Sequence, residues 1–269
     1  LGQRDQASEA RQRAFADAPE SSGAKYFEMI TLEQGARWQE ALQIAEDLAT
    51  QLPDGTLADT PSLWKPLLRL RIRDQISRET PRRDWAKVES LVETIAASPA
   101  ADPEEIERIR VEVLAARGKL DEALASSETL VVDHPDNPSL FAQNLVLLVV
   151  AGRADEARSR LAAGAEHLRD SAEVLEAEAR LAATAPAAEA TGWLTDLEAR
   201  MGRMSGPAAD RCARQLIAIH IGRGNVADAE RLAKKVLARQ PKDLATRQVV
   251  LEIAAERDAV DEVAREAAE

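Results

Sequence analysis

The 269-residue sequence predicts an all-α solenoid built from antiparallel helix pairs, and two observations of spacing predict it. Four glycines are each followed 17 or 18 residues later by a proline, and an alanine lies five or six residues after each glycine. The pairs are Gly2/Pro19, Gly35/Pro53, Gly118/Pro135 and Gly224/Pro241, with Ala7, Ala41, Ala123 and Ala229 between them. Self-similarity at a fixed period is the sequence mark of a repeat protein.

The composition agrees with stacked helices. Hydrophobic residues make up 45% of the chain but aromatic residues only 3%, so the apolar surface is mostly Ala, Leu, Val and Ile. Strands favour β-branched and aromatic residues in alternation, and the chain has no sustained alternation of that kind. Because each repeat packs only on its neighbours, an array of this length needs no single central core.

Charge and apolar content exclude several classes of function. The net charge of −12 argues against a nucleic acid partner, which needs a basic footprint. No run approaches the roughly 18 apolar residues of a membrane span, so we expect no direct membrane insertion. A lone cysteine cannot decide between the cytoplasm and the periplasm. The many arginines and alanines indicate a GC-rich bacterial gene, and the abrupt ends indicate a segment of a longer protein.

The helix starts are marked by capping residues followed by proline. Thr60-Pro61, Asp102-Pro103 and Asn137-Pro138 each offer a side-chain oxygen to a free N–H of the first turn. Proline at the first helical position loses nothing, because its missing donor would be unpaired there. The glycines at the inter-helix turns allow the positive φ that a helix end often needs.

The second helix of each pair shows apolar residues at helical spacing, as in Leu120, Ala123 and Leu124. We expect the alanine of this pattern to lie where the two helices of a pair approach closely. The elements together predict one solenoid over 1–269, with a half repeat at 1–19 and pairs at 22–53, 61–99, 103–135, 138–169, 171–203, 207–241 and 242–269.

These features resemble the tetratricopeptide repeat (TPR), a helix–turn–helix unit of about 34 residues. Gly118 and Gly152 are 34 residues apart, as are Gly224 and Asp258. The inter-helix glycine, the alanine after it (Ala157 included) and the proline that closes the second helix all match. The resemblance implies a right-handed superhelix whose concave face, lined by the first helix of each pair, holds a peptide or a partner protein.

A basic cluster from Lys65 to Lys87 is the first candidate site in this acidic chain. Lys65, Arg69 and Arg73 are four residues apart and share one helix face. The apolar residues of the segment, Ile76 among them, occupy most of the remaining circumference. One interpretation is a site for an acidic peptide, because arginine offers carboxylates two parallel hydrogen bonds. The other is a solvated face that pairs with nearby Asp and Glu.

The second candidate is Arg211, Arg214 and Gln215, in the pair at 207–241. They fall near the positions that clamp a carboxylate in some members of the resembling family. The equivalent positions of two other pairs hold Glu105, Arg108 and Glu112, then Ser139, Ala142 and Gln143. The two-repeat clamp is therefore absent, and its activity is not carried over.

The remaining chemistry-bearing residues are interpreted as structure. The tryptophans lie at helical positions beside apolar neighbours, and no histidine has the spacing to carboxylates that a metal site needs. Cys212 is interpreted as a small buried residue. Acidic runs such as DPEEIER and EVLEAEAR are typical of solvated helix faces. No catalytic motif or phosphate loop is present, so we expect neither an enzyme nor a bound cofactor or metal.

Two functions from different classes stay open. The first is a protein–protein interaction scaffold that presents a concave groove. The second is a structural spacer or self-associating array, because neither terminus reads as a polar cap and solenoids need capped ends. The half repeat would expose Ala7, Ala10, Ala14 and Phe15 unless another molecule covers them.

Overall fold

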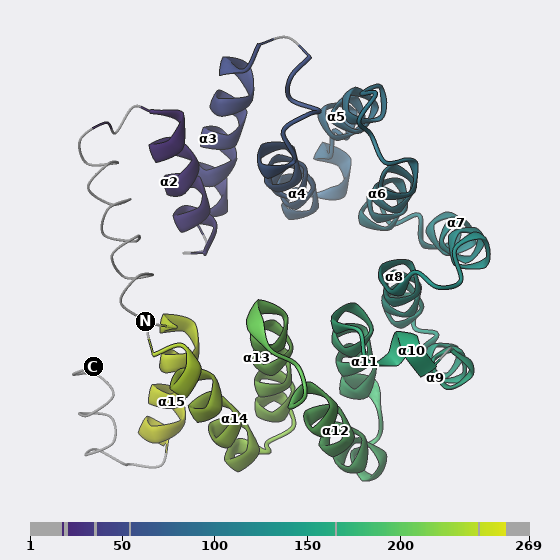
Figure 1. Cartoon of the computed structure of the whole chain (residues 1–269), viewed down its shortest axis with the longest axis vertical. Coiled ribbons are helices and arrows are strands. Elements are labelled where there is room, and N and C mark those ends of the chain that lie inside the picture. The colour runs from purple at the N-terminus through teal and green to yellow at the C-terminus, as the bar shows by residue number, and fades with distance from the viewer. Residues whose placement is uncertain are drawn as a thin grey trace. The chain divides into compact units, whose positions relative to one another are not determined.

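A computed structural model describes residues 18, 21–34, 37–53, 55–164, 166–241 and 243–256 (Figure 1). The prediction of an all-α array of helix pairs is confirmed, since the described residues form helices and connecting turns without a strand. None of the described helices is long and apolar enough to cross a membrane. Some predicted features lie outside the described residues. These are the half repeat apart from Ala18, with its Gly2, and also Gly35, Asp258 and the helix predicted around and after Asp258.

The chain divides into two compact units, residues 1–123 and 124–269. In the first unit, α2 pairs with α3 and α4 pairs with α5, and each second helix also contacts the first helix of the next pair. The bounds are α2 Ser22–Gln34, α3 Trp38–Gln51, α4 Pro61–Ser77, α5 Ala86–Ala96 and α6 Pro103–Ala116. Helix α7, Leu120–Asp133, runs across the division.

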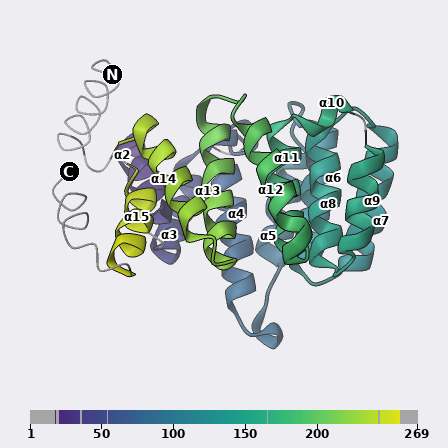
Figure 2. The same ribbon diagram turned by 90° about the horizontal axis from the view of Figure 1, so that it is seen from below.

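The second unit repeats this packing. Its first helices α8, α11 and α13 contact one another in sequence, and α12 and α14 pack against them as second helices (Figure 2). The bounds are α8 Pro138–Val150, α9 Ala154–Ala163, α10 Glu166–Arg169, α11 Ala172–Thr184, α12 Ala187–Met201, α13 Gly206–Gly222, α14 Val226–Arg239 and α15 Leu244–Glu256. The single solenoid over both units stays a prediction of the sequence.

Of the predicted turns and caps that fall on described residues, all but one form. Gly118, Gly152 and Gly224 have φ of +81°, +75° and +75°, the left-handed region that glycine enters without steric cost. Asp102 and Asn137 accept hydrogen bonds from N–H groups of the helices that follow them. Thr60 was predicted as a cap, but its hydroxyl donates to the carbonyl of Thr56 at 2.9 Å instead.

The repeat alanines on described residues are buried between helices. Ala41, Ala123, Ala157 and Ala229 are completely buried. Ala41 belongs to the same buried core as Leu67 in the first unit, and Ala229 belongs to the same core as Leu216 in the second. Because a methyl group already fills each position, any larger side chain must displace a neighbouring helix.

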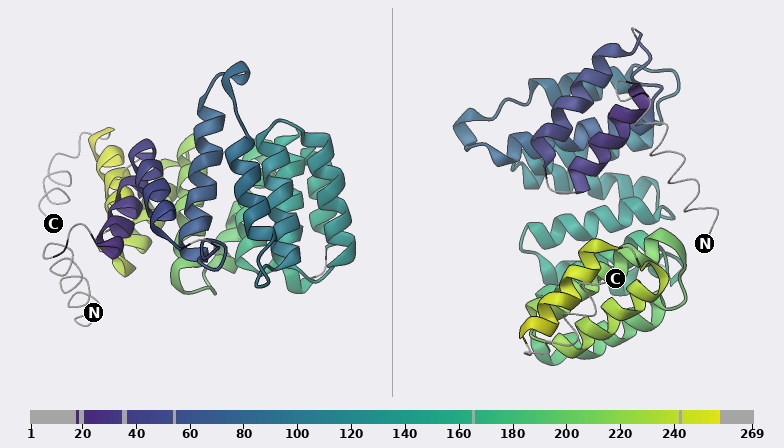
Figure 3. Two further views of the ribbon diagram at one scale, coloured as in Figure 1. Left: turned by 90° about the horizontal axis from the view of Figure 1, so that it is seen from above. Right: turned by 90° about the vertical axis from the view of Figure 1, so that its left-hand side faces the viewer.

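The turn after α4 departs from the regular repeat. Helix α4 and a short 3₁₀ turn, η1 (Thr80–Arg82), project past the ends of the neighbouring helices of their unit (Figure 3, left). Ile76 was placed on an apolar face by the sequence, but 49% of it is exposed because it lies in this projection. Polar contacts order the turn: the Gln75 Oε1 accepts from the Asp84 N–H at 2.6 Å, and Arg83 donates to the Ile76 carbonyl.

The end of α9 gives a stability prediction. A Cβ added to Gly164 would lie 2.7 Å from the ring of Phe141, which is buried on α8. Gly164→Ala should lower the free energy of unfolding by about 1–3 kcal/mol, the usual cost of overpacking a core. Gly192→Ala is the matched control. Gly192 lies inside helix α12, and a Cβ added there would have no atom within 4 Å. This substitution should raise the free energy by about 0.5–1 kcal/mol. Urea denaturation of both variants checks the difference, and equal stabilities would contradict the packing of Phe141.

Candidate functional site

A groove of about 440 Å³ lies between α4 and α6 in the first unit. Both are first helices of their pairs and lie side by side, with α5 packed against both (Figure 1). The lining side chains are Trp64, Lys65, Leu68, Arg69 and Ile72 from α4, and Arg108, Ile109 and Glu112 from α6. This volume is in the range of pockets that hold small ligands, so the groove suits a few side chains of a partner rather than a whole domain.

The floor of the groove is apolar. Trp64, Leu68 and Ile109 are buried core residues that also line the groove, and Ile72 is half-buried beside them. The Trp64 Nε1 is buried without a hydrogen-bond partner among the described residues. The Lys65 ammonium lies 5.2 Å from the centroid of the Trp64 ring, within reach of a cation–π attraction.

The rim of the groove is made of ion pairs that join neighbouring repeats. Lys65 Nζ lies 2.6 Å from Glu105 of α6, and Arg69 donates from Nε and Nη2 to both oxygens of Glu33 of α2 at 2.7 and 2.8 Å. The hydrogen bonds with Glu33 raise the pKa of Arg69 above its ordinary value. On α6, Arg108 donates to Glu112 at 2.8 Å.

The cations of the groove are paired with carboxylates, two of which, Glu33 and Glu105, lie outside its lining. Its lining carries three cations and one carboxylate, whereas the whole sequence has a net charge of −12. In the two inter-repeat pairs the cation is the more exposed member: 48% for Lys65 against 27% for Glu105, and 60% for Arg69 against 19% for Glu33. The cations therefore face solvent at the groove mouth.

The structure separates the predicted basic stripe into two parts. Lys65 and Arg69 line the groove, whereas the Arg73 guanidinium lies 5.6 Å from the centroid of the Trp38 ring, outside it. The rest of the basic cluster pairs locally, as in Arg71 with Glu46 at 3.3 Å and Arg78 with Asp74 at 2.7 Å. The half of the groove on α6 was not identified as a site from the sequence.

The second predicted set lies on α13, a first helix of the second unit. Arg211 is 3.1 Å from Glu176 of α11, and the Gln215 Nε2 donates to the Glu176 carbonyl at 3.0 Å. Arg214 is 2.9 Å from Asp243, next to the start of α15. The three side chains thus connect α13 to the first helices on either side.

Cys212 lies between these residues and is completely buried, as the sequence predicted. Burial raises the pKa of its thiol to about 12, so the thiol stays protonated at neutral pH and is a poor nucleophile. In the described part of the chain, no group of three or more His, Cys, Asp and Glu side chains is arranged to hold a metal ion.

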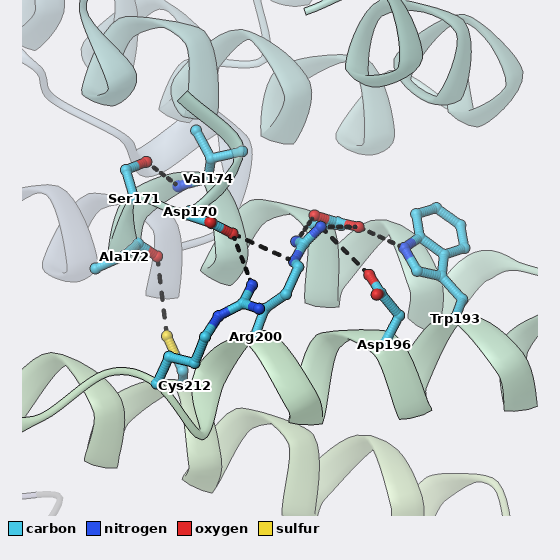
Figure 4. Close-up of polar contacts among 10 residues, drawn as sticks. Asp170, Ser171, Ala172, Val174, Trp193, Asp196, Arg200 and Cys212 are labelled. Carbon is cyan, nitrogen blue, oxygen red and sulfur yellow. Dashed lines mark hydrogen bonds and ion pairs between the residues drawn. The ribbon is translucent and has the colours of Figure 1, made fainter. Parts of the chain in front are cut away.

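A buried ionic cluster in the second unit corrects the interpretation of EVLEAEAR as a solvated face. Glu178 of α11 is only 1% exposed. It accepts a hydrogen bond from the Trp193 Nε1 at 2.6 Å and pairs with Arg200, both on α12. Figure 4 shows Arg200 between Asp170 and Asp196, which lie 3.8 and 3.4 Å from its guanidinium. Burial raises the pKa of Glu178.

Comparisons with known proteins return fold neighbours only. No protein-family model and no characterised protein sequence matches the chain. A tetratricopeptide repeat protein from Parabacteroides merdae is 16% identical, with a TM-score of 0.43, over 76% of each chain. The human IFIT1 dimer with PPP-AAAA is 14% identical, with a TM-score of 0.39, over 92% of this chain and 57% of IFIT1. The P58(IPK) TPR domain is 14% identical, with a TM-score of 0.29, over 98% of this chain and 77% of that domain.

The described helices form an array of helix pairs that resembles tetratricopeptide repeats. This resemblance rests on the turn glycines, the buried alanines and the helix–turn–helix units of the chain itself.

Proposed function

We propose that the chain is a protein–protein interaction scaffold and that the groove between α4 and α6 holds a peptide segment of its partner. The observation that carries this proposal is the groove itself, which joins an apolar floor to a cationic rim on the first helices of two neighbouring repeats. An apolar floor provides affinity by burial, and a few placed polar groups fix orientation.

We propose an acidic peptide rather than a nucleic acid as the partner. The groove lining carries more cations than carboxylates, while the chain as a whole is strongly acidic and would repel a long polyanion. The scaffold is proposed to act without chemistry, because its one thiol is buried and protonated. The alternative of a spacer or self-associating array depends on the two chain ends, most of which lie outside the described residues.

A selection from a random peptide display library tests the proposed function. The chain is the target, and the variant Glu112→Trp is the counter-target, because a bulky ring at this half-exposed rim position covers the groove. Glu107→Trp is the matched control on the exposed side of the same helix. We expect peptides that bind the wild type and the control variant but lose at least about ten-fold in affinity for Glu112→Trp, or about 1.4 kcal/mol.

Circular dichroism should show the same helix content in all three proteins, since both changes are on the surface. Binders that are indifferent to Glu112→Trp, or a selection that enriches none, would contradict a peptide-binding groove between α4 and α6.

A further inference from the structure

We propose that the turn at 78–85, between α4 and α5, is a processing site at which an endopeptidase hydrolyses the peptide bond between Arg82 and Arg83. The class of enzyme is one that carries a carboxylate in the pocket for the residue before the bond, as trypsin does. The inference goes beyond the proposed function, because the groove is lined by residues outside this turn. It is supported by the place of the turn, the exposure of Arg82 and the backbone around it.

The turn at 78–85 is the longest connection between described helices that contains an arginine or a lysine. The connection at 52–60 is longer but contains neither residue type. Because the turn at 78–85 lies past the ends of the neighbouring helices of its unit, an enzyme can approach it without meeting those helices (Figure 3, left). Exposed loop tips are the preferred places of proteolytic nicking.

Arg82 is the most accessible of the three arginines in this turn. Its side chain is 79% exposed, and its partner Glu79 lies 3.6 Å away and is itself 76% exposed. Arg78 is held more closely, 2.7 Å from Asp74. Arg83 donates hydrogen bonds to two backbone carbonyls at 3.1 and 3.2 Å. Because an ion pair between exposed side chains contributes little, Arg82 can leave Glu79 for an acidic pocket at low cost.

The backbone on both sides of Arg82 favours binding to an endopeptidase, which holds its substrate as an extended strand. Glu79 has φ −57° and ψ 141°, and Arg83 has φ −76° and ψ 125°. Only η1, Thr80–Arg82, has to open, and all three of its residues are exposed. Two hydrogen bonds close it: the Arg82 N–H donates to the Glu79 carbonyl at 2.8 Å, and the Arg83 N–H donates to the Thr80 carbonyl at 3.3 Å. Water replaces such exposed bonds at a modest net cost.

Hydrolysis breaks the bond between the Arg82 carbonyl carbon and the Arg83 nitrogen. Water supplies the hydroxyl that completes the carboxylic acid of Arg82 and the proton that completes the amine of Arg83. The fragments 1–82 and 83–269 should stay together, because α4 and α5 both contribute buried leucine side chains to one core of the first unit. The cut thus removes the covalent link between α4 and α5 without dismantling the unit.

Limited digestion of the chain with trypsin tests the inference, with the products identified by mass spectrometry over time. Between residues 21 and 256, we expect the first cut after Arg82. Arg82→Gln should slow the cut at this bond at least about ten-fold, because an uncharged side chain leaves the carboxylate of the pocket unpaired. Arg203→Gln is the matched control, since Arg203 is an exposed arginine in the turn between α12 and α13. It should leave the rate of the cut after Arg82 unchanged.

Three outcomes of the digestion would overturn the inference. They are a first cut elsewhere between residues 21 and 256, the absence of any cut in that range, and an unchanged rate at this bond in Arg82→Gln.

Size-exclusion chromatography and circular dichroism of the cut chain test whether the unit stays assembled. The cut chain should elute at the volume of the intact chain and keep its helix content. Separation of the fragment 1–82 from the fragment 83–269 would overturn the proposed processing, because the cut would then destroy the array. None of these outcomes depends on peptide binding, so a failure here leaves the proposed function standing.

Discussion

Replacing Glu178 by alanine should lower the free energy of unfolding by about 3–5 kcal/mol, the usual result of removing one partner from a buried ion pair. The carboxylate is completely enclosed and holds two donors of α12, the Trp193 indole and the Arg200 guanidinium. Without it, the buried Trp193 indole loses its acceptor, and Arg200 keeps only the exposed carboxylates of Asp170 and Asp196. Chemical denaturation followed by circular dichroism measures the loss, and tryptophan fluorescence reports the changed surroundings of Trp193.

Glu178→Gln is the matched variant, because its amide oxygen can still accept the Trp193 N–H. It should cost clearly less than Glu178→Ala. An alanine variant that loses no more than about 0.5 kcal/mol, the range of ordinary surface changes, would contradict the buried cluster.

Wild type and Glu178→Gln should also differ in how their free energies of unfolding depend on pH. Burial raises the pKa of Glu178 above its ordinary value of 4.5 in the folded state. The folded state therefore binds this proton more tightly than the unfolded state does. The stability gained from this tighter proton binding is fully present below pH 4.5 and is lost as the pH rises through the folded pKa of Glu178. The free energy of unfolding of wild type should accordingly fall relative to Glu178→Gln across that range, and a gap that moves the other way would contradict the raised pKa.

Replacing Ala229 by arginine should cost at least about 4 kcal/mol, a loss that only a few mechanisms in a core produce. Ala229 is completely buried in α14 and packs in the core that includes Leu216 of α13. An arginine there overpacks the contact and brings an unpaired charge into it. Because each repeat depends on its neighbours, the helices on both sides of α14 should lose structure with it.

Ala238→Arg is the control for this experiment, since Ala238 lies on the exposed side of the same helix. It should change the free energy of unfolding by no more than about 0.5 kcal/mol. Loss of helix content and the midpoint of urea denaturation distinguish the two variants. Equal midpoints would show that the alanines of the repeat are not at the closest helix contacts.

Local constraints explain why much of the fold could be predicted. Gly118, Gly152 and Gly224 were identified because a positive φ and a close turn restrict the residue type at a single position. The buried alanines were identified because a close contact between helices recurs once in each repeat. Thr60 could not be assigned correctly from its spacing, because its hydroxyl has a backbone carbonyl within reach that competes with the cap.

Tertiary contacts explain what could not be predicted. The burial of Glu178 depends on Trp193 and Arg200, which lie 15 and 22 residues away on another helix. Only the α4 half of the candidate groove could be recognised from the sequence, where Lys65 and Arg69 stand out as a basic stripe on one helix. The alignment of repeats placed Arg108 and Glu112 at first-helix positions equivalent to those of the second candidate set, and this was the signal for the α6 half. That these residues face α4 across a groove depends on how the two helices pack, which the alignment does not give.

Methyl NMR spectra of the chain, with and without the tightest groove-selected peptide, test the central claim most directly. The claim is that a partner peptide binds between α4 and α6. It predicts that added peptide shifts the methyl signals of Leu68, Ile72 and Ile109 and leaves those of Leu216 and Ile217 on α13 unchanged. Shifts that gather on α13, around Arg211 and Arg214, and spare the methyl groups of α4 and α6 would contradict it.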